Sequence, residues 1–288
     1  MIIDAHAHLW KKQNGIVNGK PVYDIGGGKS DFGGEIRQMM PPYMTDGENT
    51  AERFLANMDY AGVSGAVITQ EYIDGNQDKY LLSCKSDRIK VCALYEEKAL
   101  GDISGFDGVK ICASRLYDKN LLNHLEPFKK AAENNKFISI DLADGDEQTY
   151  MMKEIIRMFP ELRIAVGHFG MVTRDGWLEQ IKLAENENVF IESGGITWLF
   201  NNEFYPYPSA VKAINEAAQL VGFNKLMWGS DYPRTMTAIT YKMSLDFVEK
   251  TNLISSENKK LFLGENAKKF YGFDNLSVPE RIKNMVED

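Results

Sequence analysis

The chain opens with the stretch Met1-Ile2-Ile3-Asp4-Ala5-His6-Ala7-His8-Leu9-Trp10, in which an apolar start leads into a His-x-His pair. In a β-strand, residues two apart project from the same face, so the imidazoles of His6 and His8 would point together. Two neutral imidazoles side by side form half of a site for a first-row metal ion. Surface histidines near a free N-terminus are the simpler alternative. The chain has only four histidines, however, and two of them form this pair.

Short apolar runs that alternate with helical patterns follow this stretch. After the opening run, strands are predicted at residues 65–70, 89–95, 108–112, 137–141, 163–168, 188–193 and 225–231. Helices are predicted at residues 50–60, 78–87, 121–135, 147–158, 177–186, 209–221 and 239–251. Eight apolar strands that alternate with helices indicate a parallel sheet covered on both faces, and in one chain of this length a (β/α)8 barrel. Residues 96–107 are too few for a full helix, so the third unit is expected to be distorted.

The barrel is expected to account for the whole chain, residues 1–288, as one domain with two additions. Residues 10–49 contain Gly26-Gly27-Gly28, Gly33-Gly34 and Pro41-Pro42, which break regular structure. A connection of this length is usually functional, so we expect a loop over the site with Tyr23, Arg37 and Tyr43 as candidate substrate contacts. A surface loop packed on its own aromatic side chains is the alternative. The C-terminal helices, within residues 252–288, are expected to pack outside the barrel or against a partner.

Composition excludes several classes of protein. The chain has 44% hydrophobic and 26% charged residues, as a soluble globular protein does, and its net charge of −8 argues against nucleic acid or an anionic membrane as a partner. No apolar run reaches the roughly 18–20 residues of a membrane span, and no basic leader precedes Ile2. Cys84, Cys92 and Cys112 are odd in number and lack CxxC spacing. They are expected to be reduced thiols in a cytoplasmic protein, a catalytic cysteine being the alternative.

Polar side chains stand in or at the ends of the predicted strands. In a (β/α)8 barrel these carboxyl ends form the active site, so the residues concerned are candidates to converge there. They are His6 and His8, Gln70 and Glu71, Lys110, Asp141, His168, Glu192 and Ser193, and Asp231.

Each candidate also has a purely structural explanation. His168 could be a core histidine, Asp231 a helix N-cap and Asp141 a turn former. Lys110 lies between Val109 and Ile111, so it would be buried and would need a carboxylate partner or a substrate anion. Three arginines that follow strand ends, Arg115, Arg174 and Arg234, either clamp a substrate carboxylate or are solvated surface residues.

Together these residues resemble the amidohydrolase superfamily, in its amidohydrolase-related branch of decarboxylases and of sugar-lactone and pyrone-dicarboxylate lactonases. The resemblance rests on Asp4-Ala5-His6-Ala7-His8, on Gly167-His168-Phe169-Gly170, and on Leu226-Met227-Trp228-Gly229-Ser230-Asp231-Tyr232-Pro233. It implies that His6, His8 and Asp231 hold one divalent ion, Zn²⁺ first and Mn²⁺ second, and that His168 acts near the substrate. Where the family has a fifth-strand histidine, this chain has Asp141. Asp141 is therefore either a replacement ligand or a sign of a metal-free site.

The resemblance implies hydrolysis of a small carboxylated or sugar-derived lactone or ester. The ion would activate water, Asp231 would act as general base, and His168 would stabilise the carbonyl oxygen. Lys110, Arg115, Arg174 and Arg234 would bind the substrate carboxylate. Non-oxidative decarboxylation of an unsaturated or aromatic acid on the same site is the alternative, and a barrel that binds a small molecule without turnover is a third. A homodimer is a further expectation.

Overall fold

The computed structural model describes residues 1–97, 99–280, 282, 283 and 285. Eight strands form one sheet in the order β1-β6-β7-β8-β9-β10-β11-β12. All the pairings along this order are parallel. Their bounds are β1 Ile3–His8, β6 Gly65–Thr69, β7 Ile89–Leu94, β8 Gly108–Cys112, β9 Phe137–Asp141, β10 Ile164–Val166, β11 Val189–Glu192 and β12 Leu226–Met227.

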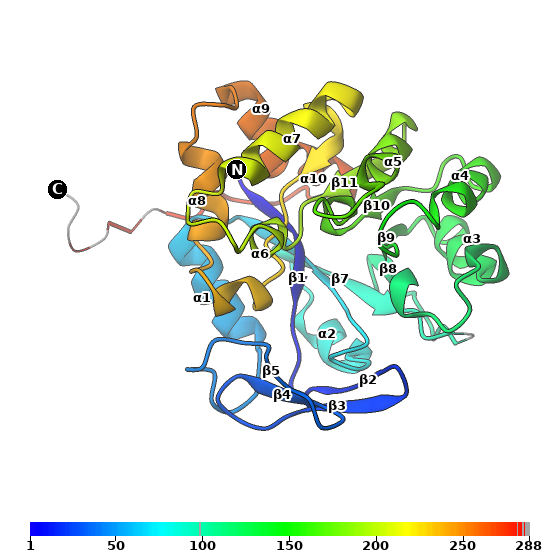
Figure 1. Ribbon diagram of the computed structural model, residues 1–288, viewed down its shortest axis with the longest axis horizontal. Helices are drawn as coiled ribbons and strands as arrows, with labels where there is room; N and C mark the ends of the chain where they lie inside the picture. Colours follow the sequence, from blue (N-terminus) through cyan, green and yellow to red (C-terminus); the bar gives the residue numbers. More distant parts are fainter. Residues whose placement is uncertain (98, 281, 284, 286–288) are drawn as a thin grey trace.

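The two edges of this sheet meet between β1 and the segment that follows β12. The backbone N–H of Ala5 donates to the Trp228 carbonyl at 2.9 Å, and that of His8 donates to the Tyr232 carbonyl at 2.8 Å. The sheet therefore closes into the predicted TIM-like (β/α)8 barrel, with the strands in the interior and most helices around them (Figure 1).

The helices of the described chain are α1 Ala51–Ala61, α2 Asp78–Cys84, α3 Leu125–Glu133, α4 Thr149–Met158, α5 Trp177–Ile181, α6 Ile196–Leu199, α7 Pro208–Val221, α8 Met243–Lys250, α9 Ser256–Lys260 and α10 Asn266–Tyr271. Most of the helices bury apolar side chains against the outer face of the sheet, whereas α9 buries none and α10 packs at one end of the barrel interior. In α1, Phe54, Met58 and Ala61 are buried at helical spacing, and Gly62 ends the helix with a left-handed φ of 75°. The third unit is distorted as predicted, because the described residues between β7 and β8 form no helix.

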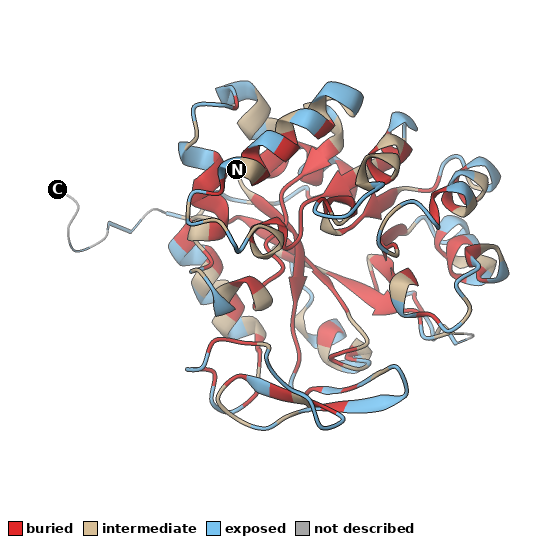
Figure 2. Ribbon diagram, in the orientation of Figure 1, coloured by how far each residue is buried: buried red, intermediate tan, exposed pale blue. Residues whose placement is uncertain are grey.

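Alternation along the strands decides which side chains enter the barrel. Ile138 and Ile140 of β9 pack in the large core between sheet and helices, whereas Phe137 joins the smaller core inside the barrel. Ser139 and Asp141 share the parity of Phe137 and are also buried. The same period of two places Lys110 on the inner face of β8 and Glu192 on the inner face of β11. Nearly all residues of the barrel strands are buried (Figure 2).

Two predictions about the additions require correction. Residues 10–49, expected to be an irregular loop, contain a four-stranded antiparallel sheet made of β2 Asn14–Val17, β3 Lys20–Asp24, β4 Lys29–Phe32 and β5 Ile36–Gln38. The Gly and Pro clusters fall in its turns and after β5, so they separate short strands rather than prevent them. Figure 1 shows this sheet beside one end of the barrel.

The C-terminal segment folds partly as predicted. α9 and α10 flank a π-helical turn at Leu261–Glu265, and α10 does not lie free of the barrel. Its residues Ala267, Phe270 and Tyr271 pack against the inner side chains Ile3 and Phe137, so the segment covers one end of the barrel interior. Within the region where C-terminal helices are expected, residues 278–280, 282 and 283 are not helical, and residues 281, 284 and 286 lie outside the described part of the chain. No helix of the described chain is both long and apolar enough to cross a membrane.

Candidate active site and metal centre

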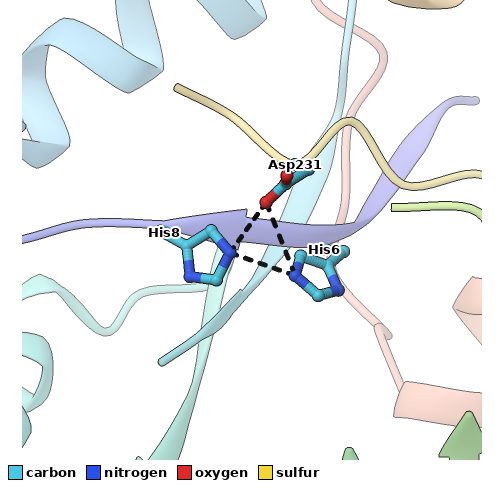
Figure 3. Close-up of side chains that lie close together, drawn as sticks. All are labelled: His6, His8 and Asp231. Carbon is cyan, nitrogen blue, oxygen red and sulfur yellow. Dashed lines mark hydrogen bonds and ion pairs between the residues drawn. The ribbon is translucent and has the colours of Figure 1, made fainter. Parts of the chain in front are cut away.

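The His-x-His pair of β1 meets Asp231 at the mouth of the barrel. His6 Nε2 lies 3.0 Å from His8 Nε2, and Asp231 Oδ1 lies 2.9 Å from His8 Nε2 and 3.8 Å from His6 Nε2. All three residues are buried, and Figure 3 shows their three polar atoms converging on one another. The strand periodicity of β1 and the closure of the barrel thus bring together residues 223 positions apart.

The hydrogen bond of His6 to Glu192 leaves a lone pair of His6 directed at this point. His6 Nδ1 lies 2.6 Å from Glu192 Oε1, and because a carboxylate can only accept, His6 donates from Nδ1 and keeps its lone pair on Nε2. Burial, with a contribution from Arg234, lowers the pKa of His8 well below its ordinary value, so His8 is neutral.

The proton on His8 has no position that satisfies both ring nitrogens. Nδ1 of His8 has no hydrogen-bond partner among the described residues. A proton on Nε2 can be donated to Asp231 but leaves Nδ1 as a buried acceptor without a partner. A proton on Nδ1 leaves that N–H without a partner and also leaves two imidazole lone pairs and a carboxylate facing one another. A divalent ion removes the repulsion of the second arrangement, because it replaces it with three attractive contacts. The donor set of two imidazoles and one carboxylate suits Zn²⁺ and also accepts Mn²⁺, so the residues fit the implied metal.

Asp231 is held in an unusual backbone conformation. Its φ is 59°, in the left-handed region that non-glycine residues adopt rarely. The backbone N–H of Asp231 donates to the His6 carbonyl at 2.9 Å, and the indole Nε1 of Trp198 donates to Asp231 Oδ2 at 2.7 Å. Burial favours the neutral acid, but the His8 hydrogen bond and the nearby charges outweigh it and lower the pKa of Asp231. Asp231 is therefore ionised at neutral pH.

Asp141 belongs to a second group, formed with Lys110 and His168. Lys110 Nζ lies 2.6 Å from Asp141 Oδ1, and His168 Nε2 lies 3.5 Å from Asp141 Oδ2. Burial opposes all three charges, yet their mutual attraction prevails: it raises the pKa of Lys110, holds that of Asp141 well below its usual range, and raises that of His168 to about 10. Asp141 is thus neutralised by the protein itself.

Two further sets of side chains have metal-ligand spacing, and both include Asp141. One joins it to His6 and His168, the other to Glu71 and Cys112. Because burial raises the pKa of the Cys112 thiol well above its ordinary value, this residue remains a thiol and is a poor ligand. A metal at either set would also compete with Lys110 for Asp141. The donor set of His6, His8 and Asp231 is the one that fits an ion best.

A cavity of about 450 Å³ opens beside this centre, lined among others by His8, His168 and Asp231. Arg234, Arg115 and Arg37 line it too, so two of the predicted substrate-binding arginines and one predicted loop contact reach the site. A larger cavity of about 790 Å³ shares only Arg115 with it and contains none of the converging residues.

The other predicted side chains lie elsewhere. Arg174 pairs with Asp144 at 3.1 Å on the surface and does not line the 450 Å³ cavity. Lys110 is fully buried against Asp141, beneath the cavity rather than in its lining. Tyr23 pairs with Asp31, within the small sheet.

Arg234 is fixed by one carboxylate and leaves part of its guanidinium free. Its Nη2 donates to both oxygens of Asp74, at 2.7 and 2.9 Å. Its buried Nη1 has no hydrogen-bond partner among the residues that the structure describes, and lies 3.9 Å from Asp231 Oδ1. The chain thus presents an unpartnered cationic donor next to the candidate metal-binding residues.

Several residues of the site carry no strong signal in the sequence. Glu192 stands at a strand end, but only the structure shows that it orients His6. Asp74 and Trp198 lie in loop and helix segments after β6 and β11, where spacing indicates no role. Asp4 belongs to the opening motif and accepts hydrogen bonds from Ser230 and Tyr241, and burial raises its pKa to about 6.

Comparison with known proteins assigns the chain to a family. The sequence model of the amidohydrolase family matches residues 3–273. The protein belongs to the amidohydrolase family. This confirms the resemblance drawn from the opening, Gly-His-Phe-Gly and Gly-Ser-Asp-Tyr-Pro motifs. No curated protein matches the chain.

Solved structures show the same fold at low sequence identity. A probable 2-pyrone-4,6-dicarboxylic acid hydrolase from Acinetobacter baumannii with bound citric acid has a TM-score of 0.68 and 18% identity, over 94% of this chain and 99% of that one. An amidohydrolase from Burkholderia multivorans with bound zinc has a TM-score of 0.67 and 15% identity, over 94% and 99%. A manganese-bound 5-carboxyvanillate decarboxylase from Novosphingobium aromaticivorans has a TM-score of 0.52 and 16% identity, over 76% and 80%.

Proposed function

We propose that this amidohydrolase hydrolyses a small carboxylated lactone or ester with one divalent ion held by His6, His8 and Asp231. The observation that carries the proposal is the convergence of two imidazole nitrogens and one carboxylate oxygen within 3.8 Å in a buried site. When bound, the ion supplies Lewis acidity, which polarises a carbonyl and makes water more acidic. Zinc in one similar structure and manganese in another support this choice of ions.

The side chains around the centre divide the remaining work. Asp231 is ionised, as a general base must be, and can accept the proton of the attacking water and return it to the leaving oxygen. His168 donates from Nδ1 to the Gly194 carbonyl at 2.8 Å, and its raised pKa keeps the ring cationic at neutral pH. A fixed cation at the cavity wall stabilises the negative charge that develops on the carbonyl oxygen.

The cavity favours a substrate that carries a carboxylate. Arg234 lines the cavity and is held by Asp74, and its buried Nη1 has no hydrogen-bond partner among the described residues. An unpartnered buried donor of this kind costs free energy unless a ligand satisfies it, and a carboxylate oxygen does so best. The bound citric acid of the Acinetobacter baumannii structure supports the same class of ligand. The 450 Å³ volume suits a small molecule.

Decarboxylation is the second candidate, because the 5-carboxyvanillate decarboxylases share the fold and one of them holds manganese. Both reactions would use the same centre and the same arginine. The products separate them: ring opening yields a hydroxy acid with consumption of base, whereas decarboxylation releases CO2. A panel of lactones and of aromatic acids, assayed for both products, decides between the two.

The direct test is the metal content of the purified protein. We expect about one Zn or Mn per chain in the wild type and in a Lys110→Met/Asp141→Leu double variant, and a loss of most of it in His6→Ala. His124→Ala is the matched control, since His124 is buried against Tyr95 and Asp118.

Each result has a defined meaning. Wild-type protein without stoichiometric metal, active in the presence of chelators, would contradict the proposed centre. Loss of metal in the double variant would make Asp141 a ligand after all.

A further inference from the structure

Trp198 contacts the candidate metal centre through the oxygen of Asp231 that faces away from the histidines. Its indole Nε1 donates to Asp231 Oδ2 at 2.7 Å, while Oδ1 lies 2.9 Å from His8 Nε2. Trp198 belongs to α6, the short helix after β11, and its ring also meets the edge of His168, with centroids 5.8 Å apart. The two oxygens of Asp231 therefore have separate and fixed environments.

A pair of glycines makes this contact sterically allowed. Gly195 has a φ of 72°, and a Cβ on it would lie 1.9 Å from Trp198 Nε1, so the indole rests directly on the glycine backbone. A Cβ on Gly194 would lie 2.7 Å from Cγ of His6 and 2.8 Å from Glu192 Oε2. The turn from β11 into α6 thus packs against both the histidine and the tryptophan of the site.

A second contact ties α6 to the segment that carries Asp231. The hydroxyls of Thr197 and Thr235 lie 2.7 Å apart, both buried, and Thr235 belongs to the turn that follows Asp231. α6 is therefore fixed relative to Asp231 by adjacent residues, and the indole is held at hydrogen-bond distance by the backbone rather than by its own side-chain torsions alone.

The alternative partner of Asp231 is Arg234, whose free Nη1 lies 3.9 Å from Oδ1. Rotation of the carboxylate toward Arg234 would form an ion pair and cancel the negative charge that a metal ion requires. The indole N–H is a neutral donor, so it fixes Oδ2 without neutralising the carboxylate. Trp198 thus opposes an inactive arrangement that the same buried charges would otherwise favour.

We propose that the Gly194, Gly195 and Trp198 turn is a positioning element for the metal centre: Trp198 anchors Asp231 Oδ2 so that Oδ1 remains directed at His6 and His8. This inference rests on the proposed metal site. Outer partners that orient ligands typically change metal affinity by 10- to 100-fold.

The test measures Zn²⁺ affinity by competition with a chromophoric chelator. Trp198→Phe keeps an aromatic ring without a donor, and replacement of Trp198 by 3-benzothienylalanine exchanges N–H for sulfur at nearly the same shape. We expect both to weaken Zn²⁺ binding by about 10- to 100-fold. Trp177→Phe, on α5 and stacked on Phe169, is the control and should leave affinity unchanged.

Two glycine variants distinguish displacement of the Trp198 indole from general backbone strain. Gly195→Ala should displace the indole and weaken Zn²⁺ binding to the same degree. Gly62→Ala is the matched control, because Gly62 has a similar φ of 75° and a Cβ on it would meet no other atom of the described chain within 4 Å. It should lower stability but not affinity for the ion.

A measurement on the metal-free protein tests the hydrogen bond between Trp198 and Asp231 itself. In the ¹H–¹⁵N spectrum the Trp198 indole signal should lie downfield, as a charge-assisted donor does, and should move upfield in Asp231→Asn. If the wild type binds Zn²⁺ and the benzothienyl protein binds it with the same affinity, this inference is overturned but the proposed centre is not. A wild type that binds neither Zn²⁺ nor Mn²⁺ would overturn the proposed centre and this inference with it.

Discussion

The group around Asp231 and the group around Asp141 use similar side chains but balance their charge differently. Each has one buried carboxylate next to imidazole nitrogen. Asp141 is paired at 2.6 Å with Lys110 and faces the cationic ring of His168. Asp231 faces two histidines, of which His8 is neutral, and its nearest guanidinium nitrogen is 3.9 Å away.

The difference explains why one group fits a metal ion and the other does not. Burial of a carboxylate is costly unless a cation or strong donors compensate for lost water. Lys110 provides that compensation for Asp141, so a divalent ion would have to displace a buried ammonium. At Asp231 no cation lies so close, because His8 is neutral and the nearest guanidinium nitrogen is 3.9 Å away, so a divalent ion would meet less competition. The aspartate at the fifth barrel strand thus forms an internal ion pair with Lys110, and in the proposed centre the ion would be held by the first strand and the segment after the last strand.

Removal of Lys110 should produce the largest effect on the fold. Lys110→Met leaves Asp141 buried with only the longer His168 contact, and we expect a loss of about 3–5 kcal/mol in the free energy of unfolding. Lys110→Met/Asp141→Leu should recover most of it, since no unpaired charge then remains. Urea unfolding of the three proteins measures both values. A loss below about 1 kcal/mol in the single variant would mean that the pair is solvated and that Asp141 is available to a metal.

Removal of the negative charge of Asp231 should affect catalysis rather than the stability of the fold. Asp231→Asn keeps the shape of the side chain but removes the proposed base and one donor of the proposed centre, so kcat/KM for lactone hydrolysis should fall by about 100- to 1000-fold. Asp246→Asn, on α8 between Lys242 and Lys250, is the control and should remain active. Activity within about threefold of wild type in Asp231→Asn would show that the catalytic base lies elsewhere.

Much of the difference between the Asp231 group and the Asp141 group can be predicted from the sequence. Strand periodicity places His6 and His8 together, and the position of Lys110 between Val109 and Ile111 predicts a buried ammonium in need of a carboxylate partner or a substrate anion. Barrel topology explains why the strand-end residues could be grouped without coordinates, since parallel strands all deliver their carboxyl ends to one side.

Other parts depend on contacts that spacing does not reveal. The sequence does not decide whether Asp141 is a metal ligand or a structural residue, because its role depends on which neighbouring strand supplies the nearest cation. Trp198 and Asp74 act through loops whose path is set by tertiary packing. The small sheet within residues 10–49 was missed because its strands are four residues or so long and are separated by glycines, which weakens the two-residue period. That sheet is nevertheless connected to the site: Ser30 donates to Gln13, and Gln13 donates to Asp74, the partner of Arg234.

The protonation states of His168 and His8 test directly how the charges of Asp141 and Asp231 are balanced. The expected effect on the free energy of unfolding is smaller than that of removing Lys110. The pKa of His168 is raised from 6.5 to about 10 in the folded protein, despite burial, by Asp141, Asp231 and Glu192, whereas that of His8 is lowered. A raised histidine pKa contributes stability that is complete below pH 6.5, declines as pH rises, and is lost above about pH 10. The free energy of unfolding should therefore fall between pH 7 and 10, with a shallower slope in His168→Asn.

Histidine ¹⁵N shifts at pH 7.5 should show His168 doubly protonated and His8 neutral in the same metal-depleted protein. If His168 is neutral at that pH, its Asp141 contact carries no ion pair, and Lys110 alone balances that carboxylate. If instead His8 is cationic, the proton already supplies the positive charge that Asp231 needs. The two carboxylates would then be balanced alike, and the case for a metal ion at Asp231 would be lost.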